Sequence, residues 1–328
     1  MLLSRNSGCK GTLFFLFTKG FSFFIFIFAN DMITELSILL PAFNTSCYQL
    51  VQHLLNQLEQ QQVVENLQYE IVVAEDGSTN QATIDENSKI EGFPNCRHII
   101  RTTNAGRSAI RNFLAQQAKY EWLLFIDSDM DIGKDFVSKY LLLDNVHVVY
   151  GGYVPLQDEK QWQGNLRYLY ETTNLSAHTC EERLKHPYKD FHTSNFLTKR
   201  STLLRYPFNE HIREYGYEDV LWGKTLKEKG VPITHIDNPV IFAIFEDNPS
   251  YLQKTETALH TLFKFKEDLQ DYSRLLATAQ RLQKTKMSGV VKMVFGICKK
   301  SFQKNLTSTH PSLTIFKFYK LGYFLSIA

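Results

Sequence analysis

The chain has 328 residues, with 36 Lys and Arg against 34 Asp and Glu, and 44% of it is hydrophobic. The length suits one large domain with an appendage or two ordinary domains, and the composition is that of a globular protein, which excludes a disordered or fibrous chain. The net charge of +2 hides a segregation. Residues 1–30 hold three basic and no acidic residues, 272–328 hold ten basic and no acidic residues, and the body between them is at −11. An acidic body argues against nucleic-acid binding, and the basic tail indicates an anionic partner.

The five cysteines lie far apart in the sequence and form no CxxC pair. Disulfide scaffolds and structural zinc sites depend on regular cysteine spacing, so both are disfavoured. Because disulfides are rare in reducing compartments, the pattern favours a cytoplasmic protein.

Residues 13–29 are rich in phenylalanine and invite interpretation as a membrane anchor. Lys19 and Gly20 divide the run, however, and each half is shorter than the roughly 20 residues that span a bilayer. No small-residue cleavage site follows, and Met32 stands just before the first strand-like segment. We predict that translation starts at Met32 and that residues 1–31 are an over-extended or disordered leader. The alternative is a weak signal anchor.

From residue 36 onward, short apolar runs alternate with segments of helical spacing. This order predicts an α/β fold in which a mostly parallel sheet is flanked by helices. Ligands of such sheets bind at the carboxyl ends of the strands, so polar residues there are the first candidates for a site. The patterns predict strands at 36–43, 69–78, 97–103, 121–131 and 146–154, and helices at 47–66, 107–118, 213–230 and 252–285.

Two carboxylates follow the apolar run at 122–126, and a third ends a neighbouring strand. Asp127 and Asp129 could hold Mg²⁺ or Mn²⁺, which prefer oxygen ligands, or they could cap a helix that begins near Gly133. The presence of Asp76 nearby favours the cation site over the helix cap. Carboxylates gathered at one sheet edge repel one another unless a cation or ligand binds them. We therefore expect a cation site that neutralises a diphosphate.

Two further segments allow a functional and an ordinary interpretation. Asn104 precedes a helix on which Arg107 and Arg111 share a face; they either bind a phosphate or pair with surface acids, and the residues alone favour neither. Glu218 and Asp219 open another helix, where acids are ordinary, although they could supply a general base. No GxGxxG follows a strand and no P-loop motif occurs, which disfavours dinucleotide enzymes and P-loop NTPases.

Five segments, taken together and in order, resemble a family 2 glycosyltransferase of the GT-A fold. The resemblance spans about residues 33–250 and points to bacterial enzymes that build cell-surface polysaccharides. It implies a nucleotide-sugar-binding GT-A catalytic domain at 32–250, divided into a nucleotide-binding half (32–131) and an acceptor half (132–250). A basic helical C-terminal extension follows at 251–328. The five segments are SILLPAFN (37–44), EIVVAEDGST (70–79), NAGRSAIRN (104–112), WLLFIDSDMD (122–131) and YGYEDVLWGKTLKEKG (215–230).

The resemblance also implies roles at the sheet edge. Phe43 would flank the nucleotide base, Asp76 would hydrogen-bond the base edge, and Asp127 would face the ribose or the donor sugar. Asp129, together with Asp127, would ligate the Mn²⁺ or Mg²⁺ that bridges the diphosphate. Glu75 stands where the family usually has another aspartate. The donor-binding residues implied are Pro41, Ala42, Phe43, Glu75, Asp76, Asn104, Arg107 and Asp127.

Catalysis, by the same resemblance, would fall to the Glu218–Asp219 pair. Asp219 would deprotonate the acceptor hydroxyl, and Glu218 would orient hydroxyl groups. The neighbouring aromatics Tyr217 and Trp222 are the candidates for stacking on the acceptor sugar. Related enzymes often complete the metal shell with a histidine, and Phe242 stands near the expected position, which leaves the third metal ligand open.

Two histidines near these segments allow a structural interpretation, and for His235 the alternative is the missing metal ligand. His235 ends a strand-like run, and His192 begins the strand-like segment that continues to Asn195. A core histidine with satisfied hydrogen bonds is the ordinary case, although either residue could line the site.

The expected function is that of an inverting hexosyl- or N-acetylhexosaminyltransferase. It would move a sugar from a nucleotide-sugar, for which we expect a UDP-sugar, to a hydroxyl of a glycan or lipid-linked saccharide in surface polysaccharide synthesis. One alternative is a non-catalytic pseudoenzyme that binds nucleotide-sugars or glycans. The other is a polyprenyl-phosphate glycosyltransferase, whose anionic acceptor would need cations such as Arg213 and Lys224 near Asp219.

The C-terminal tail combines aromatic and aliphatic residues with lysines. Lysines interrupt both 287–306 and 312–328, so neither segment predicts a clean membrane-spanning helix. Basic amphipathic segments suit the headgroup layer of an anionic membrane, which predicts a peripheral protein at the inner face of the cell membrane. The alternative is a helical flap packed on the catalytic domain.

Overall fold

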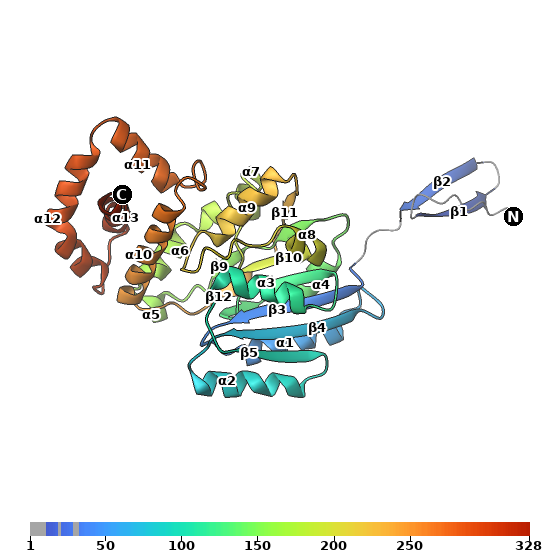
Figure 1. Ribbon diagram of the computed structural model, residues 1–328. Helices are drawn as coiled ribbons and strands as arrows, with labels where there is room; N and C mark the ends of the chain where they lie inside the picture. The colour runs from blue at the N-terminus through green and yellow to red at the C-terminus, as the bar shows by residue number, and fades with distance from the viewer. Residues whose placement is uncertain (1–10, 19–20, 29–32) are drawn as a thin grey trace.

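The computed structural model describes residues 11–18, 21–28 and 33–328 (Figure 1). Near the N-terminus, β1 (Gly11–Thr18) and β2 (Phe21–Phe28) pair as an antiparallel hairpin. Residues 1–10, 19–20 and 29–32 lie outside the described part, and the prediction that translation starts at Met32 falls there.

A seven-stranded sheet forms the centre of the body, in the spatial order β11–β8–β10–β6–β3–β4–β5. Neighbouring strands run parallel, except that β10 is antiparallel to both β6 and β8. The prediction of a mostly parallel sheet flanked by helices is therefore confirmed. The strands are β3 (Glu35–Ala42), β4 (Gln68–Asp76), β5 (Cys96–Arg101), β6 (Trp122–Ile126), β8 (Val148–Tyr150), β10 (Asn195–Lys199) and β11 (Ile233–His235).

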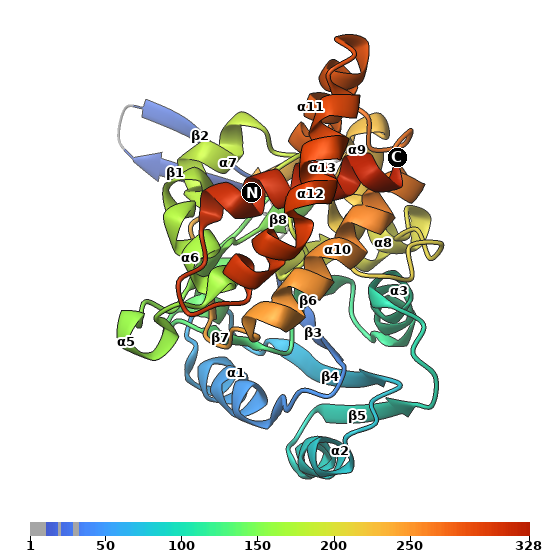
Figure 2. The ribbon, with the colours of Figure 1, turned by 90° about the vertical axis from the view of Figure 1, so that its left-hand side faces the viewer.

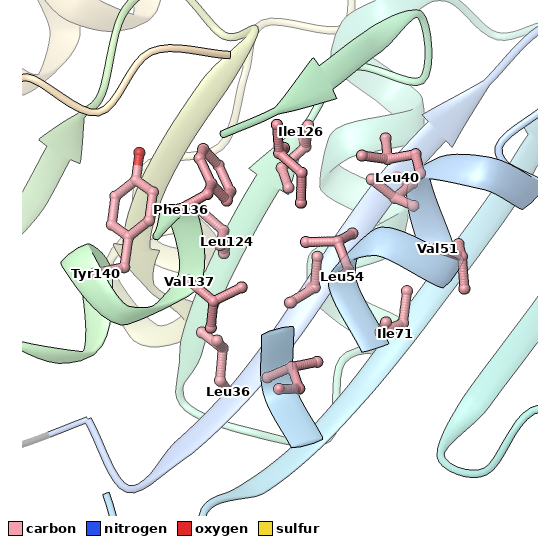
Figure 3. Close-up of a cluster of buried hydrophobic side chains, with 14 of the residues drawn as sticks. Leu36, Leu40, Val51, Leu54, Ile71, Leu124, Ile126, Phe136, Val137 and Tyr140 are labelled. Atoms are coloured by element: carbon pink, nitrogen blue, oxygen red, sulfur yellow. The ribbon is translucent and has the colours of Figure 1, made fainter. Parts of the chain in front are cut away.

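Side chains of the central strands divide between two cores. On β3, Ile38 and Leu40 enter the core drawn in Figure 3, whereas Leu39 enters the other, because successive side chains of a strand point to opposite faces. Burial on both faces explains why the strands appear in the sequence as continuous apolar runs. The first core is closed by α1 (Tyr48–Gln60) and α4 (Phe136–Leu141), the second by α3 (Arg107–Gln117), α8 (Arg200–Arg205) and α9 (Glu218–Glu228).

The strand predicted at 146–154 is two short strands in different sheets. β8 belongs to the main sheet, and β9 (Tyr153–Pro155) joins β7 (Met130–Ile132) and β12 (Val240–Phe242) in a three-stranded sheet. Gly152 separates the two strands with a φ of +92°, and a Cβ there would collide with the Arg183 guanidinium.

Shorter elements complete the body. Of these, α6 packs against β9 and reaches the candidate site. They are α2 (Gln81–Ser88), the 3₁₀ helix η1 (Lys89–Gly92), α5 (Glu159–Trp162), α6 (Leu166–Thr173), the 3₁₀ helix η2 (Leu175–His178) and α7 (Cys180–Lys185).

Helices make up the C-terminal extension, in front of the sheet in Figure 2. The single helix predicted at 252–285 is divided in two, because the chain turns at Asp271, with a φ of +68°, and Ser273 then caps the next helix. In the described part of the chain, none of the helices combines the length and apolar character needed to cross a bilayer. The helices are α10 (Asn248–Lys264), α11 (Arg274–Lys284), α12 (Ser288–Leu306) and α13 (Leu313–Ile327).

Candidate active site

Two adjoining cavities open at the carboxyl ends of β3, β4 and β6. The strand-end cavity has a volume of about 260 Å³, and the helix-side cavity, which extends toward α9 and α10, has about 390 Å³. Arg107, Asp127, Asp129 and Tyr215 line both. The strand-end cavity is also lined by Pro41, Ala42, Phe43, Thr45, Asp76, Asn104, Gly106, Ile110, Arg111, Ser128 and Arg213.

The loop after β3 forms one wall of the strand-end cavity. Phe43 is 48% exposed there, so its ring is available to a planar ligand. Asn44 fixes the loop, because its Oδ1 accepts a hydrogen bond of 2.7 Å from the backbone N–H of Thr79. Its φ of +52° is a conformation that asparagine tolerates better than most residues. The predicted trio Pro41, Ala42 and Phe43 thus lies at the cavity.

Asp76 ends β4 with both carboxylate oxygens engaged. Oδ1 accepts hydrogen bonds from Arg101 (3.0 Å) and the N–H of Ala105 (3.1 Å), and Oδ2 accepts one from the N–H of Gly106 (2.9 Å). These bonds fix the loop before α3. Gly106 there has a φ of +92°, and a Cβ would meet the carbonyl oxygen of Arg213 at 2.7 Å. Asp76 therefore holds the shape of the cavity that it lines.

Glu75 lies beneath the cavity, not on its wall. Its side chain is fully buried and is hydrogen-bonded to Ser78, to Asn87 Nδ2 (2.6 Å) and to His98 Nε2 (3.2 Å). Burial raises the pKa of Glu75, but these hydrogen bonds and the charge of His98 outweigh it and hold the pKa below its usual value. Glu75 lines neither cavity, so the expected contact with a donor becomes support of the loop that follows β4.

Two arginines of α3 face the carboxylates of the site. Arg111 is buried, donates to Asp127 Oδ1 at 2.6 Å and lies 3.6 Å from Glu218 Oε1. Arg107 is partly exposed and lies 4.0 Å from Asp127 and 3.9 Å from Glu218. The structure thus commits Arg111 to the acids and leaves Arg107 accessible to a ligand in either cavity.

Asp129 lies where the two cavities meet. Burial and repulsion by Asp127 raise the pKa of Asp129, against the opposing charges of Arg107, Arg167 and Lys254. Like-charged carboxylates at one point favour a cation between them.

The donor set fits a divalent cation only in part. Mg²⁺ is commonly held by one or two carboxylates together with substrate phosphates, and Asp129 and Asp127 Oδ2 provide such oxygens. In the residues that the structure describes, no group of three or more His, Cys, Asp or Glu side chains is arranged to hold a metal. A cation here would therefore take further oxygens from a bound ligand.

Asp219, in the first turn of α9, lines the helix-side cavity and is paired with a histidine. His192 Nδ1 lies 2.8 Å from Asp219 Oδ2. Burial raises the pKa of Asp219, but the hydrogen bond and charge of His192 outweigh burial and lower it. Burial lowers the pKa of His192, and Asp219 more than reverses that effect. The pair therefore keeps Asp219 ionised at the cavity wall.

His192 itself lines the helix-side cavity, which corrects the expectation of an ordinary core histidine. Its ring makes edge contacts with Tyr150 and Tyr153, at centroid distances of 5.9 and 5.8 Å. These contacts fix the ring beside Asp219. The sequence signal was a histidine at the start of a strand-like segment, which does not identify a partner on a helix 27 residues later.

Two neighbours of Asp219 also lie where they were expected. Tyr217 and Glu218 line the helix-side cavity. Burial and the charge of Asp219 raise the pKa of Glu218, in spite of Arg107 and Arg111. Burial likewise raises the pKa of Tyr217 to about 12, so its hydroxyl stays protonated at neutral pH.

Trp222 lies away from the site, and its expected contact with an acceptor is wrong. It is 2% exposed, stacks on Phe208 with ring centroids 4.6 Å apart, and donates from Nε1 to the carbonyl of Tyr206 at 2.7 Å. The side of α9 that carries Trp222 packs on the second core. Proximity to an acidic pair in the sequence did not reveal which face of the helix is buried.

The position expected for a third metal ligand is apolar. Phe242 is buried, and the Arg167 guanidinium lies 4.1 Å above its ring. Glu246 pairs with Arg167 and, at 3.0 Å, with Lys254, so both cations are held at the helix-side cavity. His235 is buried, its Nε2 lies 2.8 Å from the carbonyl oxygen of Pro187, and it lines neither cavity. Nothing in the sequence near the motifs indicated that Arg167 and Lys254 would lie at this cavity.

A family model described as "Glycosyl transferase family 2" matches residues 37–206. The chain belongs to this family. The matched segment includes the carboxyl ends of β3, β4 and β6, which form the strand-end cavity, and the fold is the GT-A-like α/β fold expected from the sequence.

Curated relatives are also glycosyltransferases. The chain is 30% identical over 121 residues to an uncharacterised glycosyltransferase of Haemophilus influenzae, covering 36% of this chain and 46% of that protein. It is 32% identical over 111 residues to the poly(ribitol-phosphate) β-N-acetylglucosaminyltransferase TarS of Staphylococcus aureus, covering 34% of this chain and 18% of TarS. The chain thus spans less than half the length of these relatives.

Among solved structures, the mannosyltransferase PcManGT of Pyrobaculum calidifontis, in complex with GDP-mannose and Mn²⁺, has a TM-score of 0.52. It is 15% identical, and the match covers 89% of this chain and 84% of that chain. This likeness shows the fold alone.

Proposed function

We propose that the chain is an inverting, metal-dependent glycosyltransferase that takes a hexosyl or N-acetylhexosaminyl group from a UDP-sugar. The acceptor is a hydroxyl of a glycan or lipid-linked saccharide in bacterial surface polysaccharide synthesis. Residues 32–250 form the catalytic domain and residues 251–328 the extension. The observation that carries the proposal is the pairing of Asp219 with His192 beside a cavity that adjoins the strand-end cavity.

In this proposal the strand-end cavity takes the nucleotide. Phe43 flanks the base, Asp76 borders its edge, and Asn104 follows on the loop before α3. Arg107 and the N-terminal end of α3 face the diphosphate, because a helix N-terminus and a guanidinium both favour anions.

Asp129 and Asp127 would hold the Mn²⁺ or Mg²⁺ that accompanies the donor. When bound, such a cation neutralises the negative charge of the departing nucleoside diphosphate. Arg111 holds Asp127 in place from the buried side, through the bond of 2.6 Å to Oδ1.

Asp219 acts as the general base. Its carboxylate takes the proton of the acceptor hydroxyl as the hydroxyl oxygen attacks the anomeric carbon. The bond from that carbon to the diphosphate oxygen breaks on the opposite face, so the anomeric centre inverts and Arg107 meets the charge of the leaving group. His192 holds Asp219 ionised and oriented, and Glu218 and Tyr217 border the acceptor.

A phosphate-bearing acceptor is the second candidate. Arg167 and Lys254 line the helix-side cavity, and cations there suit an anionic acceptor. The cations first expected for this role lie differently: Arg213 lines the strand-end cavity, and Lys224 donates to the carbonyl of Asp268 at 2.6 Å. The name of TarS gives poly(ribitol-phosphate) as the acceptor of that relative, which supports this candidate.

The proposal is tested with the full chain and a panel of nucleotide-sugars, with Mn²⁺ or Mg²⁺. A ligand that binds the folded state raises its apparent stability by RT ln(1 + [L]/Kd), so the true donor gives the largest rise in Tm. Release of the nucleoside diphosphate on adding glycan, lipid-linked or phosphate-bearing acceptors then identifies the acceptor. Stabilisation by a donor without release in any of these reactions would indicate the non-catalytic alternative.

The cation assignment has a matched control two residues away. Asp129→Asn is expected to abolish the part of the Tm shift that depends on Mn²⁺. Asp131→Asn is expected to retain it, because Asp131 pairs with His53 at 3.1 Å and lines neither cavity. Equal metal dependence in both variants would remove Asp129 from the proposed site.

A further inference from the structure

The outward side of α12 carries a stripe of exposed apolar side chains. Val290, Met293, Val294 and Ile297 are spaced three and four residues apart, so they share one face of the helix. Each is between 47% and 77% exposed, and Met287 extends the row just before the helix. Among the described helices, none exposes as many large apolar residues. In Figure 1 this helix lies at the far left edge of the molecule, and contiguous apolar surface of this kind usually marks an interaction site.

Lysines continue the same face. Lys300 and Lys304 follow Ile297 by three and seven residues, and both are exposed. The segment 272–328 holds ten basic and no acidic residues. Across the described part of the chain, no ion pair joins any of these ten to a carboxylate. No described carboxylate therefore pairs with the charge around the stripe.

The other lysine-containing segment has a different place. On α13, Phe316, Tyr319, Phe324 and Leu325 are at most 1% exposed, and the helix packs against α10 and α12. The interpretation as a helical flap therefore describes α13, which forms the inner core of the extension. α12 presents the outer surface.

We infer that α12 docks on the surface of an anionic bilayer, with its apolar stripe in the headgroup layer and its lysines on lipid phosphates. An apolar stripe bordered by cations and free of acids is complementary to that layer. It is poorly suited to a second copy of the chain, because stacked stripes would bring like-charged lysines together. Docking of α12 does not require glycosyl transfer. Its link to lipid-linked acceptors rests on the proposed function, in which docking would place the cavities near them.

The first measurement is local to the helix. Full-length protein is oxidised with dilute peroxide, and sulfoxide formation at Met287 and Met293 is followed by mass spectrometry. Vesicles of saturated phosphatidylglycerol and phosphatidylcholine are expected to slow oxidation of both residues severalfold. Vesicles of phosphatidylcholine alone are expected to leave the oxidation rates as they are in buffer.

Variants then assign the binding to this face by vesicle co-sedimentation. Met293→Gln/Ile297→Gln is expected to lower partitioning to anionic vesicles by about tenfold or more. Lys300→Gln/Lys304→Gln is expected to lower it by about tenfold at low salt and less at high salt. The control Leu142→Gln/Leu204→Gln replaces two exposed leucines, one directly after α4 and one on α8, and both helices lie away from α12 in Figure 1. This variant is expected to partition like the wild type.

Three results would overturn the inference. One is equal protection of Met293 by neutral and anionic vesicles, or no protection by either. Another is unchanged partitioning of the Met293→Gln/Ile297→Gln variant. The third is a wild-type dimer in light scattering that this variant dissociates, which would assign the stripe to a second copy. Donor-induced Tm shifts on the same variants show whether each is folded, and they test the proposed function separately.

Discussion

At the scale of single residues, the candidate base depends on one neighbour. Asp219 is partly buried, and burial alone would raise its pKa and protonate it more easily. His192, 2.8 Å away, reverses this by donating a hydrogen bond and supplying charge. A base in this setting stays ionised across the physiological range, and its proton affinity is set by a residue outside the recognised motifs.

His192→Gln removes the charge and keeps a hydrogen-bond donor. Asp219 then loses the main group that opposes burial, so its pKa rises. The acidic limb of the pH profile of kcat/KM is therefore expected to move to higher pH. His53→Gln, at an exposed pair away from both cavities, is the control and should leave the profile unchanged. An unmoved acidic limb in His192→Gln would show that His192 does not tune the base.

Glu75 offers a test of stability at the same scale. Its pKa is lowered in the folded state, so its contribution to stability is present above the unfolded pKa of about 4.3 and is lost as the pH falls through the folded value. Glu75→Gln is expected to lower the free energy of unfolding by about 1–3 kcal/mol at pH 7, and by less near pH 4. Urea unfolding at the two pH values measures this. The control Glu91→Gln, at an exposed position, should change the free energy of unfolding little. An equal loss at both pH values in Glu75→Gln would contradict this role of Glu75.

At the scale of elements, apolar runs and helical spacing located the strands and helices around the site, because strands buried on both faces and amphipathic helices leave clear patterns. The same patterns failed where backbone geometry or long-range packing determines where a strand ends or which way a side chain faces. Gly152 ends β8 through a positive φ, and Trp222 faces the core instead of the cavity. Arg167 and Lys254 reach the site from α6 and α10, which local sequence does not show. The strand-end half of the site was therefore predictable, and much of the helix-side half was not.

The loop before α3 is predicted to tolerate no side chain at its glycine. Gly106→Ala would place a Cβ 2.7 Å from the Arg213 carbonyl oxygen in a backbone conformation that suits glycine alone. We expect a loss of stability of about 1–3 kcal/mol and a weaker Tm shift with the donor. Gly133→Ala, where a Cβ meets nothing within 4 Å, is the control for thermal unfolding. A neutral effect of Gly106→Ala would show that this loop relaxes freely.

The two outer helices are predicted to differ in their contribution to stability. Leu325 on α13 is fully buried, so Leu325→Ala is expected to cost about 2–5 kcal/mol. Ile297 on α12 is 77% exposed, and Ile297→Ala is expected to change stability by no more than about 0.5 kcal/mol. Denaturant unfolding compares the two. Similar losses would mean that α12 is packed as deeply as α13.

At the scale of the whole molecule, the charge segregation follows the architecture. The acidic body contains carboxylates that surround two cavities, and arginines of α3 hold them in position. The basic residues gather in the C-terminal helices, where α13 closes a core and α12 faces outward. The proposed function and the inferred docking of α12 together give one molecule a site for an anionic donor and a surface for an anionic membrane.

The central claim is that Asp219 is the base of a transfer reaction whose donor occupies the strand-end cavity. Its most direct test is Asp219→Asn, with transfer and donor binding measured on the same preparation. We predict that kcat falls by about 10²–10⁴-fold while the donor still raises Tm as in the wild type. Wild-type turnover in Asp219→Asn would contradict the assignment of the base.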